Sequence, residues 1–541
     1  MLISIIGKHP FPKLVVVLVA AALFLSACGQ IAASSQTTAR GGTVTYAEPP
    51  TGAPNYIFPM ESGSYLGNTN LFQFDNLIYP PLYEFDVSGK PVLDEALSMA
   101  KRPVFSANNT VVAITLKHWM WSNGTPITAG DVMFWMNLLS AATDPKAPAI
   151  GSSSEPGPGW GDSVPGGFPE NVITYKQTGT YSLTMRLNAS YNPTWYLYNE
   201  LSQITPMPKL AWDKLSSTGS VGGYDASAEA RTTLPNTSPA WYVPVNPGTA
   251  TSGALGVAQF LNSQSENIST YATNPLWQVV AGPFRLTQFT TAGFVKFVPN
   301  KSYSGSPKPS IAAFEELPYT SDTSEFNSLE SGSLTVGYLP IQDLAEKASL
   351  ERSQGYSFSP WYNYGTSFFP FNFTNQTTGP MVRQLYFRQA FQSLVNQPAW
   401  IKDFQGGYGF TNNGPVPVYP AHDPFESQLE KGKLLYPYDA KRAVALLKAH
   451  GWTVIPGGAS YCSKPGTAAD ECGAGVKANQ QASLKVVYAS GQEALTNEMA
   501  AMGSIMKQKA GIELALAAEP SATLASIMFG ACTYSAPCNN W

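Results

Sequence analysis

Few side chains in this sequence have the types and spacing that catalysis needs. The 541 residues include only four histidines: His9, His118, His422 and His450. Neither the G-x-S-x-G pattern of a serine hydrolase nor the H-E-x-x-H pattern of a zinc protease occurs. His450 follows a predicted helix, where an imidazole suits the negative end of the helix dipole. We therefore expect no enzyme; the alternative is an extracytoplasmic hydrolase whose triad is dispersed along the sequence.

The cysteines predict cross-links rather than catalysis. Four of the five form two close pairs, Cys462 with Cys472 and Cys532 with Cys538. Outside the cytoplasm such pairs usually form disulfides, and closing the loop between Cys462 and Cys472 would contribute about 2–3 kcal/mol. A four-cysteine zinc site is the alternative, but neither spacing matches a zinc knuckle. We expect no metal and no cofactor.

The beginning of the chain has the features of a targeting leader. Two lysines precede an apolar run at 14–25, which is too short for a stable membrane span. Small residues come directly before Cys28, as in a lipobox, so residues 1–28 are predicted to be a lipoprotein signal peptide with lipidation at Cys28. An ordinary signal peptide is the alternative. Residues 29–41 are small and polar and predict a flexible tether.

Composition narrows the class of partner. Without the two leader lysines, 30 basic residues face 36 acidic ones, a net charge of about −6. Nucleic-acid binding usually needs a basic face, so nucleic acid is not expected. The Gly-rich stretch 157–161 is not a phosphate loop, because Pro158 has no N–H to donate. The length predicts more than one hydrophobic core.

The most informative segment is 78–136. Its predicted elements are a strand at 82–86, a turn at 88–91, a strand at 111–116, a tight turn at 123–124 and a helix from 128. Thr128 can cap the helix, and Asp131 lies three residues later near the positive end of its dipole.

This order of elements resembles the signature region of the family 5 extracellular solute-binding proteins, the oligopeptide-, dipeptide- and nickel-binding receptors of ABC importers. Asn123 stands where that family usually has Asp, and Gly130 where it often has Glu. Further resembling segments occur in the family's order at 42–47, 280–286, 295–305, 326–334, 368–396 and 436–452. The resemblance extends from about residue 42 to the end of the chain.

The resemblance implies an α/β fold, namely the two-lobed class II fold of periplasmic binding proteins with an inserted third subdomain. The expected divisions are 42–76 and 190–370 for lobe I, 77–189 for the inserted subdomain II, and 371–541 for lobe II, with the crossing near 365–373. The family continues past the position of Trp541 with an aromatic-acid motif and returning strands. We therefore expect lobe II to be incomplete at its C-terminus.

Lobe II also has local signals of its own. Five apolar residues fall at helical spacing and are predicted to face the core: Tyr386, Phe387, Ala390, Phe391 and Leu394. A strand at 484–488, a helix at 493–511 and a strand at 512–516 are predicted next.

The resemblance implies a lipid-anchored, extracytoplasmic receptor that encloses peptides between two lobes and delivers them to an ABC permease. It would lie on the periplasmic side or on the outer face of the cytoplasmic membrane, as a monomer. The alternatives are a nickel chelate, an oligosaccharide, or a signalling peptide that is bound without import. Candidate ligand-binding residues are Tyr46, Tyr83, Trp119, Trp121, Phe371 and Asn372. Ordinary core packing is the alternative role for each aromatic residue.

Overall fold

The computed structural model describes residues 41–50, 52–61, 65, 67, 69–85, 92–142, 166–214, 254–360, 365–419, 426–429, 431, 434–520, 523, 524 and 527. The predicted leader, the lipidation site Cys28, the turn at 88–91, the stretch 157–161 and the pair Cys532 and Cys538 lie outside these residues. No helix in the described part is both long and apolar enough to span a bilayer.

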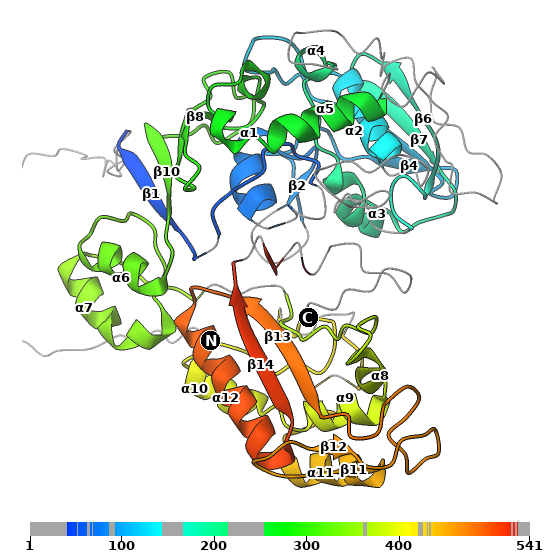
Figure 1. Ribbon diagram of the computed structural model, residues 1–541. Helices are drawn as coiled ribbons and strands as arrows, with labels where there is room; N and C mark the ends of the chain where they lie inside the picture. Colours follow the sequence, from blue (N-terminus) through cyan, green and yellow to red (C-terminus); the bar gives the residue numbers. More distant parts are fainter. Residues whose placement is uncertain are drawn as a thin grey trace, which may run out of the picture. The chain divides into compact units, whose positions relative to one another are not determined.

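The first sheet joins the beginning of the chain to residues far along it. β1 (Thr43–Glu48) runs parallel to β10 (Ala313–Pro318), and β9 (Val295–Pro299) and β8 (Phe284–Phe289) complete the order β1-β10-β9-β8. Figure 1 shows the blue strand β1 beside the green strand β10. The resembling segment at 42–47 thus forms most of β1.

A second, antiparallel sheet lies within the segment expected to be the insertion. Its strands have the order β4 (Val104–Ser106), β5 (Val111–Thr115), β7 (Ser182–Leu187) and β6 (Val172–Gly179). The wholly buried helix α2 (Ala129–Ala142) packs against β6 and against α5 (Ala254–Ser265). The strand predicted at 82–86 is present only as the two-residue β2 (Glu84–Phe85), which pairs with β3 (Leu93–Asp94).

One continuous hydrophobic core, which we call core 1, serves both sheets. It begins at Tyr56 and ends at Tyr303, and its largest fully buried side chains include Trp121, Trp135, Trp212 and Trp277. The segment expected to be inserted and the sheet of β1 therefore share their interior.

A small core covers the other face of β1. It contains Ala47 together with Leu329, Leu334 and Leu350. Leu329 belongs to α6 (Asp322–Glu330). A capping box between Ser321 and Ser324 stabilises the N-terminus of this helix. Gly332 follows α6 with φ +72°, a left-handed conformation that glycine adopts readily after a helix.

The described residues after 365 have a separate core, which we call core 2. It begins at Met381 and ends at Leu514. α9 (Leu385–Gln392), α11 (Ala440–Ala449) and α12 (Glu493–Ala510) surround the parallel pair β13 (Ser483–Ala489) and β14 (Glu513–Glu519). The five apolar residues predicted to face the core from the region of α9 are buried. The predicted strand–helix–strand order at 484–516 is confirmed (Figure 1).

The remaining elements are short. They are the π-helical turn η1 (Thr69–Asp75), α1 (Asn76–Ile78), α3 (Pro193–Asn199), η2 (Leu201–Gln203), α4 (Lys209–Trp212), η3 (Ile268–Thr270), η4 (Pro275–Gln278), η5 (Ile341–Glu346), α7 (Lys347–Ser353), α8 (Gly379–Val382), α10 (Gln397–Phe404), β11 (Trp452–Thr453) and β12 (Tyr461–Cys462). The predicted bridge between Cys462 and Cys472 is present and joins β12 to the loop that follows it. Both of these cysteines are fully buried.

Candidate ligand-binding site

The start of α2 is a structural anchor. One Asp131 oxygen, Oδ2, accepts hydrogen bonds from the Thr128 N–H at 2.8 Å and from the Thr128 hydroxyl at 2.9 Å. The other, Oδ1, accepts the Lys209 N–H at 3.1 Å. Burial raises the pKa of Asp131, and the hydrogen bonds from Thr128 and Lys209 oppose that shift. Asp131 therefore ties the helix start to the chain near α4 and is not exposed to a ligand.

Three of the candidate aromatic residues are buried in core 1. Tyr83, Trp119 and Trp121 are 0%, 5% and 2% exposed. The Tyr83 hydroxyl donates to the Lys101 carbonyl at 3.1 Å, and Trp119 meets the Tyr303 ring edge-on at 5.6 Å. These side chains pack the interior in this structure, so the alternative role of core packing is the one observed for all three.

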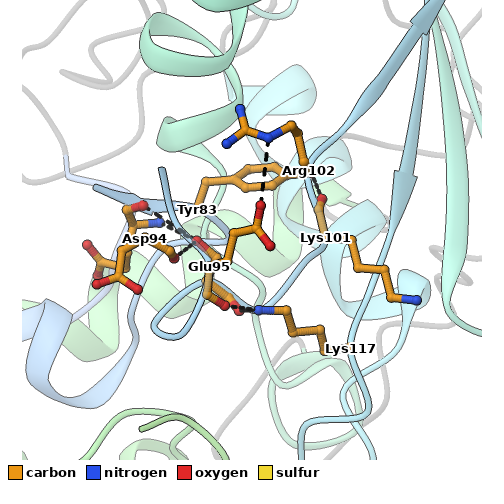
Figure 2. A network of polar contacts seen from close by, with 8 residues as sticks. Tyr83, Asp94, Glu95, Lys101, Arg102 and Lys117 are labelled. Atoms are coloured by element: carbon orange, nitrogen blue, oxygen red, sulfur yellow. Dashed lines mark hydrogen bonds and ion pairs between the residues drawn. The ribbon is translucent and has the colours of Figure 1, made fainter. Parts of the chain in front are cut away.

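A polar network surrounds the short hairpin of β2 and β3. Figure 2 shows Lys117 reaching the backbone of the turn after β3, where its Nζ donates to the carbonyls of Glu95 and, at 2.9 Å, Ser98. Arg102 meets the Glu95 carboxylate at 3.7 Å on the exposed side. Glu84 lies opposite Asp94 in the hairpin; burial, and then the charge of Asp94, raises the pKa of Glu84 to about 7.

Tyr46 lies near the carboxyl end of β1, beside two acidic side chains. Its ring is half-buried and lies 6.1 Å from that of Phe314. Burial raises the pKa of Tyr46, and the charges of Glu48 and Glu316 raise it further. The sequence analysis missed both glutamates. The alternation of β1 could have indicated Glu48, because Tyr46 and Glu48 share one face of the strand.

Phe371 and Asn372 occupy different environments. Phe371 is half-buried and meets Phe391 edge-on at 5.4 Å. The Asn372 Oδ1 atom accepts the N–H and hydroxyl of Thr374, at 3.1 and 2.8 Å, and the Asn375 N–H at 3.1 Å. This side chain therefore begins a turn that fixes the end of the extended segment 365–372.

Two stretches of the described residues from 365 onward, 368–373 and 408–410, carry exposed aromatic side chains. Phe368, Phe373, Tyr408 and Phe410 are 73%, 40%, 53% and 54% exposed. Phe410 stacks on Tyr419 with ring centres 5.8 Å apart. The Thr366 hydroxyl donates to the Pro415 carbonyl, which brings 365–373 next to the loop that carries Tyr408 and Phe410. We call these four residues the aromatic segment.

The described residues from 365 onward also contain a short sheet. β13 and β14 pair only with each other among the described strands, so each has one edge without a strand partner there. An extended peptide can add to such an edge through its own backbone, while aromatic side chains provide apolar contacts.

A cavity of about 520 Å³ lies between α9, α11 and the disulfide loop. Tyr386 and His450 line it and stack face to face with centres 3.9 Å apart. The Nδ1 atom of His450 lies 2.8 Å from the Leu446 carbonyl, in the last turn of α11. His450 therefore has the expected position at a helix end. Within the described residues, no three His, Cys, Asp or Glu side chains gather as a metal site would require.

Comparison with known proteins identifies relatives. The profile of the family described as bacterial extracellular solute-binding proteins, family 5 Middle, matches residues 96–531. A Brucella ovis protein, provisionally named an ABC transporter peptide-binding protein, is 24% identical over 221 residues, which are 40% of this chain and 38% of the relative. The chain thus matches well under half the length of that curated relative.

Two solved structures resemble the fold over 90% of this chain. The oligopeptide-binding protein AppA from Bacillus subtilis, in complex with a nonapeptide, is 16% identical with a TM-score of 0.56, and 77% of its chain is covered. NikZ from Campylobacter jejuni, in complex with Ni(L-His), is 15% identical with a TM-score of 0.57, and 75% of its chain is covered. At these identities the likeness shows the fold alone.

Proposed function

Since the chain belongs to the bacterial extracellular solute-binding proteins of family 5, we propose that it is a receptor that captures peptides for an ABC importer. Its fold is the two-lobed α/β class II fold of that family. The family match over residues 96–531 is the observation that carries this proposal. The proteins compared above are solute-binding proteins, which supports a receptor without catalytic activity.

The peptide preference is supported by the names of the Brucella and Bacillus relatives and by the exposed aromatic side chains among the described residues from 365 onward. We propose that Phe368, Tyr408 and Phe410 of the aromatic segment contact the ligand, with Tyr46, Phe371 and Asn372 as further candidates. A receptor of this kind closes its lobes over the ligand. Backbone hydrogen bonds would hold peptides of varied sequence, and water would fill the side-chain pockets.

Location and delivery complete the proposal. Lipidation of Cys28 would hold the receptor, as a monomer, at the outer side of a membrane, next to the permease subunits. Replacing Cys28 with serine should move the protein from the membrane fraction to the soluble fraction and abolish incorporation of labelled fatty acid. Incorporation of the label into the C28S protein would show that the anchor lies elsewhere.

Native mass spectrometry of the full chain tests the ligand. We expect a mixture of short peptides to yield a one-to-one adduct that releases peptide fragments. We expect F410A to weaken the binding of that peptide about tenfold, or 1.4 kcal/mol. F72A is the matched control, because Phe72 is 64% exposed but lies in η1, outside the aromatic segment. If adducts form only with a nickel–histidine chelate or an oligosaccharide, the peptide assignment is overturned, while the assignment to the solute-binding family still stands.

A further inference from the structure

Two glutamates lie side by side inside the first sheet. Tyr46 of β1 pairs directly with Glu316 of β10, and Glu48 lies two residues after Tyr46. Directly paired residues of parallel strands, and residues two apart on one strand, have side chains on the same face. Glu48 and Glu316 are each 0% exposed. The fold therefore places two carboxyl groups next to each other in the interior.

These carboxyl groups have too few donors. Gln73 of η1 donates its Nε2 hydrogen to Glu48 Oε1. Among the described residues, no N–H or O–H donates to Glu48 Oε2 or to either oxygen of Glu316. The two carboxyl groups lie within hydrogen-bonding reach of one another. A proton held between them would supply the missing donor.

No described basic side chain neutralises the pair. The polar side chains of Tyr46 in β1 and Gln73 in η1 interact with it, and neither carries a positive charge. The basic residue of the neighbouring strand, Lys296 of β9, lies 2.8 Å from Glu315 instead. Because Glu315 precedes Glu316, its side chain points to the opposite face of β10. Lys296 is therefore directed away from the pair.

The electrostatics follow from this arrangement. Two carboxylates in contact in a dry interior cannot both be ionised at low cost, so such pairs share a proton and titrate together. Burial raises the pKa of Glu48, while its hydrogen bonds with Glu316 and Gln73 oppose the rise. Burial raises the pKa of Glu316 further, and the neighbouring Glu48 adds to it.

We propose that Glu48 and Glu316 form a proton-binding site, in which one proton shared at neutral pH joins the ends of β1 and β10 and its loss at alkaline pH loosens this part of the sheet. The inference does not depend on the ligand. The folded state holds the proton more tightly than the unfolded state does. Stability from the site is therefore complete in acid and is lost as pH rises through the raised pKa of the pair.

Denaturant unfolding of the full chain between about pH 5 and about pH 9 tests the site. In E316Q the new amide can donate to Glu48 in place of the proton. The quantity to follow is the ratio of the wild-type unfolding constant to the E316Q unfolding constant. We expect this ratio to rise by up to about tenfold per pH unit over this range. E315Q is the matched control and should follow the wild type, because Glu315 is paired with Lys296 on the other face. Identical pH profiles for wild type and E316Q would overturn the proposal.

Infrared spectroscopy of the wild type provides a second readout, which is informative even when a variant fails to fold. We expect the wild type to show the C=O band of a protonated carboxyl group at neutral pH. The band should disappear at alkaline pH, and it should be weaker in E48Q than in the wild type. Absence of that band from the wild type would overturn the shared proton. The proposal would also be overturned if the wild type retained one metal ion per chain and E48Q lost it, because a cation would then occupy the place of the proton.

Discussion

The regions around core 1 and core 2 differ in how many acidic side chains they bury. The described residues before 361 include eight buried acidic side chains and no buried basic one: Glu48, Glu61, Asp75, Asp131, Glu200, Glu316, Asp322 and Glu325. The described residues from 365 onward include no buried charged side chain, but they contain the Cys462–Cys472 disulfide. The first region thus buries eight acidic side chains in or beside its two cores, and the second adds a covalent link to a core without buried charge.

This difference predicts two separate sensitivities. Each buried carboxyl group whose pKa is raised makes the first region less stable as pH rises. The second region should respond to loss of its cross-link, because that bond restricts the unfolded chain. Measuring hydrogen exchange peptide by peptide can assign each loss to a region.

The largest expected effect is that of Trp212→Ala. Trp212 is fully buried, meets Tyr79 and Trp277 edge-on at 5.0 and 5.3 Å, and donates to the Leu276 carbonyl at 2.7 Å. Its loss should destabilise core 1 by about 3–5 kcal/mol, with exchange faster in 56–303 than in 381–514. The control Trp195→Ala, at a side chain that is 41% exposed, should change stability by about 0.5 kcal/mol or less. Equal acceleration in both regions would mean that the two cores unfold as one unit.

The next effect is confined to the second region. The double variant C462S/C472S should destabilise core 2 by about 2–3 kcal/mol, because the bridge no longer limits the unfolded loop. Exchange in 381–514 should accelerate, while exchange in 56–303 should match the wild type. A loss shared with the first region would contradict the independence of the two cores.

A pH-dependent effect should appear in the first region. Because the pKa of Glu84 is raised to about 7, its contribution to stability is present below the ordinary glutamate pKa and is lost as pH rises through about 7. Glu84→Gln should remove up to about 3 kcal/mol of pH-dependent stability, measured as the difference between unfolding free energies at acid and alkaline pH. Glu95→Gln, at the exposed partner of Arg102, should leave the profile unchanged. A profile for E84Q that follows the wild type would show that Glu84 ionises as in water.

The smallest effect compares one helix start from each region. Asp439 Oδ1 accepts the Arg442 N–H at 2.9 Å at the start of α11, and Asn192 Oδ1 accepts the Thr194 N–H at 2.9 Å at the start of α3. Replacement of either residue by alanine should cost about 1 kcal/mol. Each change should accelerate exchange only in its own region, so the pair calibrates the exchange measurement.

Local patterns in the sequence were sufficient for much of core 2. The apolar spacing around Tyr386 and Phe391 predicts the buried face of α9, and the spacing of Cys462 and Cys472 predicts the bridge. Such signals involve residues close together in the chain, so no distant partner has to be known.

The candidate site was less predictable, because burial there depends on distant segments. Trp119 and Trp121 have the same side-chain chemistry whether they line a ligand or fill a core, and only packing decides between these roles. Glu48 is predicted by its strand pattern to share a face with Tyr46, but its burial depends on β10 and η1. Glu316 gives no local sign that it will meet a second carboxyl group.

The parallel pairing of β1 with β10 also sets the order in which the chain can fold. Thr43 pairs with Ala313, so the first strand to leave the ribosome has to wait for nearly three hundred residues before its neighbour is available. Closing so long a loop is entropically costly and slow compared with local helix formation. During synthesis β1 therefore lacks its β10 partner until more than half of the chain has been made.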